Sequence, residues 1–402
     1  MGTHPSCPSY TRPADGKPPC RTTLSEYLSQ HKELLSDKVI AHYKIDPSRA
    51  KDKSVLPFLF KVLSVGKALS IQAHPDRQLA QKLHAEKPNM YKDDNHKPEM
   101  AIAITDFRGF CGFRPLKETV ALLNEVPEFK GIVAPPEELL RELAAATAKA
   151  TPDEEAEKKL LRDIFGRLMK ASDASVAQYT AKLAKRYESG GDSSISELER
   201  SYSLPALCLS LQSQFPNDVG IFCAFLLNHL SLSPGQALFL GANEPHAYLQ
   251  GEIVECMAAS DNVVRAGLTP KARDVDVLVD MLTYRHGPSQ RQYMQPSKWP
   301  ADNSSGASLL YEPPIDEFNV LRTALSTDTA ETHRAIRGPS ILIVTQGEAR
   351  VQWPAAAAEA GEGGSLNLKA GNVLFVGANC PLTFTKIKTG EETVLFRAFV
   401  EI

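Results

Sequence analysis

The sequence lacks any apolar run close to the roughly 18 residues that a membrane-spanning helix needs. Its longest apolar stretch, VGIFCAFLL at 219–227, has the length of a core segment. It also lacks an excess of one charge, because 45 Lys and Arg face 48 Asp and Glu for a net charge of −3. Such a balance gives no overall attraction to nucleic acid or to a membrane, so neither is expected as a partner and any anion site must be local.

No Cys-x-x-Cys pair occurs among the seven cysteines, which are scattered along the chain. This spacing favours reduced thiols over a disulfide framework, and reduced thiols are typical of the cytosol. The sequence therefore predicts a cytoplasmic protein. Neither G-x-x-x-x-G-K-S/T nor G-x-G-x-x-G is present, so a phosphate would not be held as it is in nucleotide-binding enzymes.

The order of sequence patterns predicts a mainly β protein with an α-helical insertion. At 402 residues the chain is longer than one ordinary domain. Residues 53–115 carry short apolar runs with the alternation of strands, and strand-like runs return from about residue 231, with a predicted linker at 286–306. Residues 116–230 between them have helical periodicity. Within 154–170 one helix face carries Leu160, Leu161, Ile164, Phe165, Leu168 and Met169.

An internal repeat predicts two related β units. LSLSPGQALFLGANEPHAYL (230–249) aligns without gaps on LNLKAGNVLFVGANCPLTFT (366–385), with nine of twenty positions identical. Both copies have the pattern of short strands joined at glycines, which is typical of jelly rolls. His246 and Tyr248 of the first copy align with Leu382 and Phe384 of the second. We therefore expect a polar, working interior in the first unit and an apolar, supporting interior in the second.

A first group of possible metal ligands lies in KALSIQAHPD (67–76). In an extended strand, Ser70, Gln72 and His74 share one face. Polar groups on a buried strand cost free energy unless they find partners. A metal ion is one partner that satisfies an amide oxygen and an imidazole together.

Two further positions extend this candidate site. Glu99 heads a predicted strand whose same face carries Ala101 and Ala103, which leaves room for an ion or a substrate. His246 follows the turn of the first repeat copy, whereas His96, in a loop, is a weaker candidate. The resulting set suits Zn²⁺, with Fe²⁺ and Mn²⁺ left open by ligand type: Gln72, His74, Glu99 and His246. A divalent ion with one anionic ligand keeps positive charge and acts as a Lewis acid.

Charged residues cluster near the proposed ligands. The stretch VECMAASDNVVRAGLTPK (254–271) contains Glu255, Asp261, Arg265 and Lys271, and Lys67 and Lys97 flank the ligand segments. Cations beside a metal in a near-neutral protein indicate an anionic substrate, of which phosphate is the commonest small kind.

With these segments in view, the sequence resembles the type I phosphomannose isomerases, zinc enzymes of the cupin superfamily. The matching segments follow the family's order along nearly the whole chain: LPFLFKVLSVGKALSIQAHPD (56–76), NHKPEMAIAITDFRGFCGFRPL (95–116), PGQALFLGANEPHAYLQGEIVECMAASDNVVRAGLTPK (234–271) and GNVLFVGAN (371–379). The resemblance implies two cupin-type jelly rolls plus an all-helical domain. The expected parts are a catalytic cupin at 1–113 and 223–290, a helical insertion at 114–222 and a non-catalytic cupin at 291–402.

The resemblance also implies roles for particular residues. One Zn²⁺ per chain would be bound by Gln72, His74, Glu99 and His246, and Arg265 in SDNVVRAG would be the catalytic arginine. The implied reaction interconverts mannose 6-phosphate and fructose 6-phosphate through a cis-enediol and supplies mannose phosphates for GDP-mannose and glycosylation. Glu255 and Lys271 are both candidates for acid–base work. The expected contacts to this small phosphosugar, in a monomeric enzyme, are Ser70, Lys97, Tyr248, Glu255 and Lys271.

One departure from the family's pattern leaves alternatives open. Family members carry a few tens of residues before the segment matching MGTHPS, including a Tyr-x-Trp-Gly-like segment, so early strands of the first jelly roll are expected to be missing here. Missing strands expose sheet edges. A non-catalytic, phosphosugar-binding cupin is therefore one alternative. A cupin iron dioxygenase is another, although the amide ligand and the nearby cations argue against it.

Overall fold

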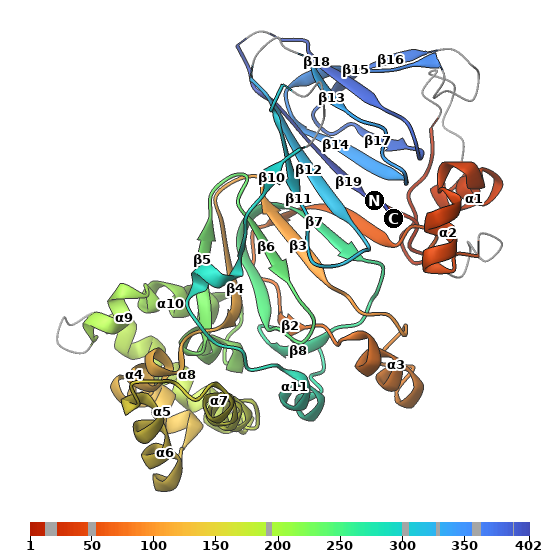
Figure 1. Cartoon of the computed structure of the whole chain (residues 1–402). Helices are drawn as coiled ribbons and strands as arrows, with labels where there is room; N and C mark the ends of the chain where they lie inside the picture. Colours follow the sequence, from red (N-terminus) through yellow and green to blue (C-terminus); the bar gives the residue numbers. More distant parts are fainter. Residues whose placement is uncertain are drawn as a thin grey trace.

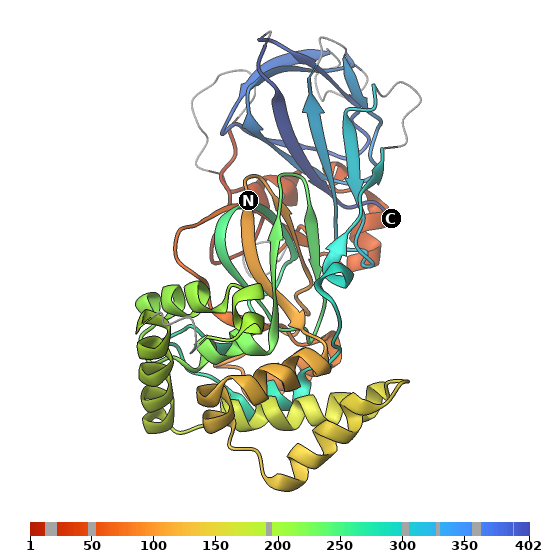
Figure 2. The same ribbon diagram turned by 90° about the vertical axis from the view of Figure 1, so that its left-hand side faces the viewer.

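The computed structural model describes residues 1–12, 22–46, 54–189, 195–299, 305–326, 330–355, 363–388 and 390–402. Two β units lie end to end, and a group of helices flanks the one at the centre (Figures 1 and 2). We call the central unit, strands β1 to β9, the first barrel, and the outer unit, strands β10 to β19, the second barrel. The prediction of a mainly β chain with a helical insertion is confirmed.

The first barrel is organised around one long strand, β7. One half of β7 pairs with β1 and β3, and the other half pairs with β2 and β4. Segments far apart in the sequence therefore meet along a single strand. The strands are β1 (Phe58–Val65), β2 (Ile71–Ala73), β3 (Glu99–Ala103), β4 (Phe107–Phe113), β5 (Leu227–Leu232), β6 (Ala237–Leu240), β7 (His246–Ala258), β8 (Val264–Gly267) and β9 (Tyr293–Met294).

The predicted alternation of side chains is confirmed in β3. Met100 and Ile102 lie in the apolar core that the two barrels share. Ala101 and Ala103 lie in the separate core inside the first barrel. Glu99, Ala101 and Ala103 lie on the same face of the strand, so the strand directs the Glu99 carboxylate into the barrel.

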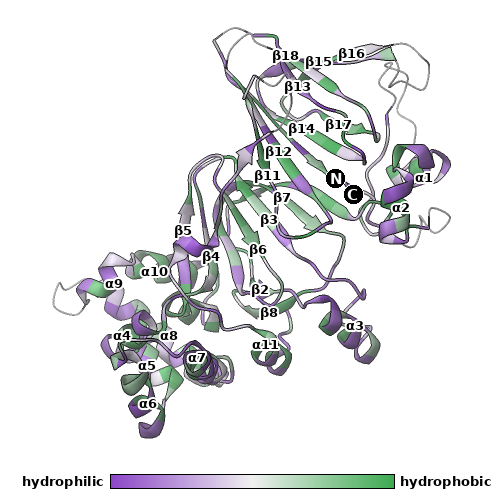
Figure 3. Ribbon diagram, in the orientation of Figure 1, coloured by the Kyte–Doolittle hydropathy of each residue, from purple (hydrophilic) through white to green (hydrophobic). Residues whose placement is uncertain are grey.

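Helices form most of the chain between β4 and β5. They are α4 (Leu116–Glu125), α5 (Pro127–Val133), α6 (Glu137–Ala148), α7 (Glu154–Met169), α8 (Asp173–Ser189), α9 (Glu197–Ser201), α10 (Leu204–Gln214) and the 3₁₀ helix η3 (Val219–Phe225). Helix α7 begins where Asp153 accepts a hydrogen bond from the Ala156 N–H, and its buried face carries the predicted Leu161, Ile164 and Phe165. In Figure 3 these helices carry both hydrophilic and hydrophobic residues, as amphipathic helices do.

The N-terminal helices pack against the second barrel, which the sequence patterns did not indicate. They are α1 (Leu24–Gln30), η1 (Lys32–Leu34) and α2 (Asp37–Tyr43). Leu28 and Val39 belong to the same core cluster as Ile341 and Phe396 of the second barrel. The remaining helices in the described ranges are α3 (Arg77–Glu86), α11 (Val275–Met281) and η4 (Ser289–Gln292), which lie in connections of the first barrel.

The second barrel repeats the local geometry of the first. Its strands are β10 (Ser297–Lys298), β11 (Ser308–Tyr311), β12 (Asn319–Leu325), β13 (Glu331–His333), β14 (Ser340–Gln346), β15 (Glu348–Trp353), β16 (Gly364–Lys369), β17 (Val373–Val376), β18 (Leu382–Lys386) and β19 (Thr393–Phe399). Gly235 and Gly371, equivalent in the repeat, have φ values of 86° and 88°, and the equivalent Asn243 and Asn379 have 62° and 64°. The repeat is therefore structural as well as sequential.

The chain crosses from one barrel to the other within the predicted linker. Strand β9 still pairs with β6 of the first barrel, whereas β10 pairs with β11 of the second. The crossing falls between Met294 and Ser297. Residues 300–304 of the linker lie outside the described residues.

The interior of the second barrel differs in part from the expectation. Leu382 and Phe384 are buried in its apolar core, as predicted. The guanidinium of Arg397 and the imidazole of His333 are completely buried in the same barrel. The prediction of a purely apolar interior was wrong for this reason: the repeat covers only three strands of each barrel, and Arg397 and His333 lie on other strands.

Two further findings bear on the composition arguments. The six cysteines in the described part of the chain are all free, and none is paired in a disulfide. No helix in the described ranges has the length and apolar character required to cross a membrane.

Candidate metal centre

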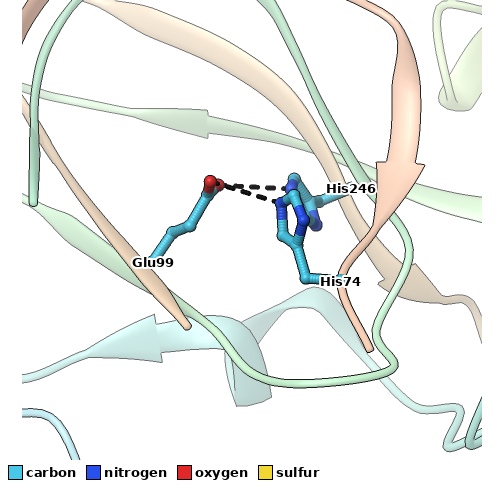
Figure 4. A group of neighbouring side chains, drawn as sticks. All are labelled: His74, Glu99 and His246. Carbon is cyan, nitrogen blue, oxygen red and sulfur yellow. Dashed lines mark ion pairs between the residues drawn. The ribbon is translucent and has the colours of Figure 1, made fainter. Parts of the chain in front are cut away.

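Three predicted ligands converge inside the first barrel. His74 follows the end of β2, Glu99 begins β3 and His246 begins β7. One ligand atom from each lies within 4.8 Å of the other two. The Glu99 carboxylate faces both rings, with Oε1 3.2 Å from His74 Nε2 and Oε2 3.4 Å from His246 Nε2 (Figure 4).

Backbone carbonyls orient both imidazoles. His74 Nδ1 lies 2.7 Å from the carbonyl oxygen of Asn262, and His246 Nδ1 lies 3.1 Å from that of Glu244. A carbonyl only accepts hydrogen bonds, so each Nδ1 carries a proton, and in the neutral form of either ring Nε2 keeps its lone pair. This use of the second ring nitrogen is typical of metal-binding histidines.

The arrangement fits a divalent cation. Both Nε2 atoms are buried and have no hydrogen-bond partner among the described residues. In a buried site, the two nitrogen lone pairs and the ionised Glu99 carboxylate repel one another electrostatically unless a cation lies between them. Two imidazole nitrogens and one carboxylate form the protein part of a usual catalytic zinc site.

The protonation states also suit metal binding. Burial lowers the pKa of His74 to about 4, so its ring is neutral near pH 7. Burial alone would raise the pKa of Glu99, but the His74 and Lys97 side chains beside it hold that pKa well below its usual value. Neutral imidazoles and an ionised carboxylate are the forms that bind a metal.

The strand register places Gln72 and Arg265 beside this cluster. Gln72 of β2 is directly opposite His246 of β7 on one side and Arg265 of β8 on the other. Residues directly opposite each other on antiparallel strands project from the same face of the sheet. Arg265 makes no ion pair with any residue in the described ranges. Its guanidinium thus lies on the ligand face without a carboxylate to neutralise it.

A second charged group lies next to the cluster and includes a residue that the sequence patterns missed. Lys61 Nζ of β1 lies 3.0 Å from Glu255 Oε2 of β7. Tyr248 contacts Glu99 Oε2 at 3.5 Å, and burial together with Glu255 and Glu99 raises the pKa of its phenol well above the usual value. The signal for Lys61 was its position as the only charge in the apolar run FLFKVLSV.

The other predicted residues lie in different surroundings. Lys97 is buried, with Nζ 3.4 Å from Glu99 Oε1. Ser70 is half-buried just before β2, and Lys271 is exposed after β8, where its N–H donates to Thr269 Oγ1. His96, the weaker ligand candidate, points elsewhere, since its Nε2 lies 2.5 Å from Glu317.

A carboxylate outside the cluster holds the turn that orients His74. Asp93 accepts hydrogen bonds from the Ser260 hydroxyl at 2.7 Å, the Asp261 N–H at 2.7 Å and the Asn262 side-chain amide at 3.2 Å. The Asn262 carbonyl of this turn is the one that faces His74 Nδ1. Asp93 therefore acts on the site through the backbone, and no spacing rule in the sequence could have identified it.

Comparison with known proteins gives one consistent family. Models of type I phosphomannose isomerase match the chain in three parts: the catalytic domain over residues 1–116, the helical insertion domain over 136–227 and the C-terminal part over 308–353.

Curated relatives extend this likeness to full length. The chain is 46% identical to a mannose-6-phosphate isomerase of Cryptococcus neoformans var. neoformans over 413 residues, which covers all of this chain and 88% of the relative. It is 43% identical to that of Saccharomyces cerevisiae over 405 residues, with the same coverage.

Solved structures agree with the sequence relatives. A zinc-bound mannose 6-phosphate isomerase has a TM-score of 0.75 and 28% identity, and a mutant phosphomannose isomerase from Salmonella typhimurium has the same values. Each comparison covers all of this chain and 90% of the other. From its sequence over the whole length and from its fold, the chain belongs to the type I phosphomannose isomerase family.

Proposed function

We propose that this chain is a zinc-dependent isomerase that interconverts D-mannose 6-phosphate and D-fructose 6-phosphate. The observation that carries the proposal is the buried cluster of two imidazole lone pairs and one carboxylate in the first barrel. The names of the relatives support the substrate, and the zinc-bound structural neighbour supports the metal.

Four residues would hold one zinc ion per chain. His74, Glu99 and His246 supply the atoms described above, and Gln72 projects from the same sheet face as His246. When bound, zinc supplies a Lewis acid that polarises a substrate oxygen. The two backbone carbonyls keep the imidazoles in the tautomer that this role needs.

The reaction moves a proton between C2 and C1 of the open-chain sugar through a cis-enediol. Glu255 and Lys271 are the two candidates for the group that carries this proton. The geometry favours Glu255, because its carboxylate is buried, lies opposite Ala101 of β3 and is held by Lys61 at 3.0 Å. Lys271 is exposed.

Arg265 would stabilise the negative charge that develops on the substrate oxygens. Its guanidinium is unpaired within the described ranges and lies on the ligand face next to Gln72. A cation that is already in position where negative charge develops stabilises the transition state without any rearrangement of the protein during the reaction. Tyr248, whose phenol stays protonated, would donate a hydrogen bond in the same interior.

The phosphate group would be bound by Ser70, Lys97 and Lys271. Binding energy from this remote group then orients C1 and C2 at the cluster. Lys97 Nζ also lies 3.4 Å from Glu99 Oε1, so this lysine would connect the phosphate contacts to the metal ligands.

The wider setting of the reaction completes the proposal. The division into 1–113 with 223–290, 114–222 and 291–402 remains our proposal for the catalytic, helical and non-catalytic parts. We also propose a cytoplasmic monomer that supplies mannose phosphates for GDP-mannose and glycosylation. Two alternatives, a non-catalytic phosphosugar-binding cupin and an iron dioxygenase, give different results in the experiment below.

A coupled isomerase assay on Arg265→Ala, with zinc content measured on the same sample, tests the proposal. We expect turnover to fall on the order of 10²- to 10³-fold at full zinc content. The matched control is Arg108→Ala, which removes an exposed arginine of β4. Turnover of Arg265→Ala equal to that of the control would contradict the assigned role. Phosphosugar binding by the unaltered chain without turnover would favour the binding protein, and turnover that needs O₂ would favour the dioxygenase.

A further inference from the structure

The second barrel contains a buried cation that forms no ion pair with any residue in the described ranges. Arg397 of β19 is completely buried, and its Nε–H donates to Ser340 Oγ at 2.9 Å. Its Nη1 and Nη2 have no hydrogen-bond partner among the described residues. The carboxylate that acts on it, Glu401, is itself bound by Arg334 at 2.7 Å. Burial lowers the pKa of Arg397 to about 10, so the guanidinium stays charged near pH 7.

Further unpartnered nitrogens lie in the same interior. His333 Nε2 lies 3.1 Å from Ser308 Oγ and 2.9 Å from Thr323 Oγ1, whereas His333 Nδ1 is buried and has no partner in the described part of the chain. When Nε2 accepts from a hydroxyl, the neutral ring carries its proton on Nδ1 and can donate it. The ring of Trp299, 6.3 Å from that of His333, has a buried Nε1–H that is also unpartnered there.

The register of the two barrels shows where this group lies. Leu240 and Val376 are equivalent in the repeat, since β6 and β17 end at these residues. Glu99 is directly opposite Leu240, and Ser340 is directly opposite Val376. Ser340 thus occupies in the second barrel the position that Glu99 occupies in the first.

The same comparison extends to two more positions. Glu99 pairs with Met257 and Ser340 pairs with Phe399, so Arg397, two residues before Phe399, corresponds to Glu255. On the other sheet, Gln72 pairs with His246, and His333 pairs with Leu382, the repeat equivalent of His246. At these two positions the second barrel therefore has Ser340 and Arg397 where the first has Glu99 and Glu255.

We propose that the second barrel binds one small monovalent inorganic anion, such as chloride, between Nη1 and Nη2 of Arg397 and the Ser340 and His333 side chains. A buried charge needs a partner, and a guanidinium offers several donors to an anion. The second barrel also contains a completely buried carboxylate, Glu331 of β13, which accepts hydrogen bonds from the Ser305 N–H and hydroxyl at 2.6 Å. Arg397 forms no ion pair with a carboxylate in the described ranges, so its single positive charge matches a single negative charge. Buried apolar neighbours, among them Leu321 and Leu342 directly opposite Arg397, restrict the site to a small ion.

Bromide replaces chloride in such sites and is identified by its anomalous scattering. Crystals of the full chain grown in sodium bromide would be measured at the bromine absorption edge. We expect an anomalous peak within hydrogen-bond distance of the two Nη atoms of Arg397. Density at this position without bromine signal would mean that water fills it, and the proposal would be wrong.

A stability measurement in solution gives a second, independent test. Thermal unfolding would be followed at constant ionic strength while sodium gluconate is replaced by sodium chloride. At a chloride concentration about ten times the Kd, the unfolding equilibrium constant of the unaltered chain should fall about tenfold.

Arg397→Met should lose this chloride dependence, whereas Arg350→Met, which removes an exposed arginine of β15 in the same barrel, should keep it. Equal chloride dependence of the Arg397→Met variant and the unaltered chain would contradict the site. If Arg397→Met does not fold, the bromide experiment decides alone. Neither readout involves isomerase activity, so the two proposals stand or fall separately.

Discussion

Removal of the Asp93 carboxylate should weaken zinc binding although Asp93 does not belong to the ligand cluster. Asp93→Asn keeps the shape of the side chain but removes the charge and at least one acceptor. The three hydrogen bonds from the 260–262 turn to this carboxylate are then weakened or lost. The turn also supplies the carbonyl that orients His74.

The size of this effect can be estimated from the contacts. Each hydrogen bond contributes about 1 kcal/mol, and the Asn262 amide keeps its bonds to the Asp93 and Asn95 carbonyls. A net loss of about 1.5–2.5 kcal/mol in orienting His74 corresponds to about 10- to 100-fold in zinc affinity, the range known for residues that support metal ligands.

Competition with a chromophoric chelator measures the zinc Kd of the variant without use of activity. The matched control is Asp94→Asn, because Asp94 is the next residue and its side chain is exposed. We expect the Kd of Asp93→Asn to rise about 10- to 100-fold and that of Asp94→Asn to stay unchanged. Equal zinc affinity of the two variants would refute the idea that the turn orients His74.

Three further predictions concern stability. Lys61→Met leaves the buried Glu255 carboxylate unpaired and should lower the free energy of unfolding in urea by about 1–3 kcal/mol. The double variant Lys61→Met with Glu255→Gln should recover part of this loss. No recovery would argue against the pair. Burial, with nearby Arg108 and Arg114, lowers the pKa of His229 to about 4. As the pH falls, the unfolded chain protonates this imidazole at a higher pH than the folded chain does, so the free energy of unfolding should fall by up to about 3 kcal/mol between pH 6.5 and 4. His229→Gln should flatten this pH dependence. An unchanged slope in the variant would contradict the assignment. Gly371→Ala forces an alanine to φ 88° and should lower the free energy of unfolding by about 1–2 kcal/mol, measured by thermal melting. The control Gly66→Ala has equally open space but no positive φ, so its stability should stay close to that of the unaltered chain. Equal losses of stability in the two variants would show that φ is not the cause.

Local patterns predicted the elements that define the ligand cluster. Alternation along 67–76 and 99–103 placed Gln72 and Glu99 correctly on their strand faces, because side-chain direction in a strand depends only on position. The repeat predicted the turn before His246, and its glycine and asparagine positions have matching φ values in the two copies.

Other features depend on contacts between distant segments and could not be predicted in this way. Lys61 pairs with Glu255 across 194 positions, and Asp93 reaches a turn more than 160 positions away. The N-terminal helices pack on the second barrel through residues such as Val39, whose apolar character is compatible with any core. Arg397 lies outside the repeated segment, so the alignment carried no information about it.

The central claim is that one zinc ion at His74, Glu99 and His246 makes this chain an isomerase. A titration of the metal-free full chain with zinc, with mannose 6-phosphate turnover measured at each step, tests it most directly. We expect activity to be absent without zinc, to rise linearly and to level off at one equivalent per chain. Full turnover by chain shown to contain no metal, or a zinc-loaded chain without turnover, would contradict the account.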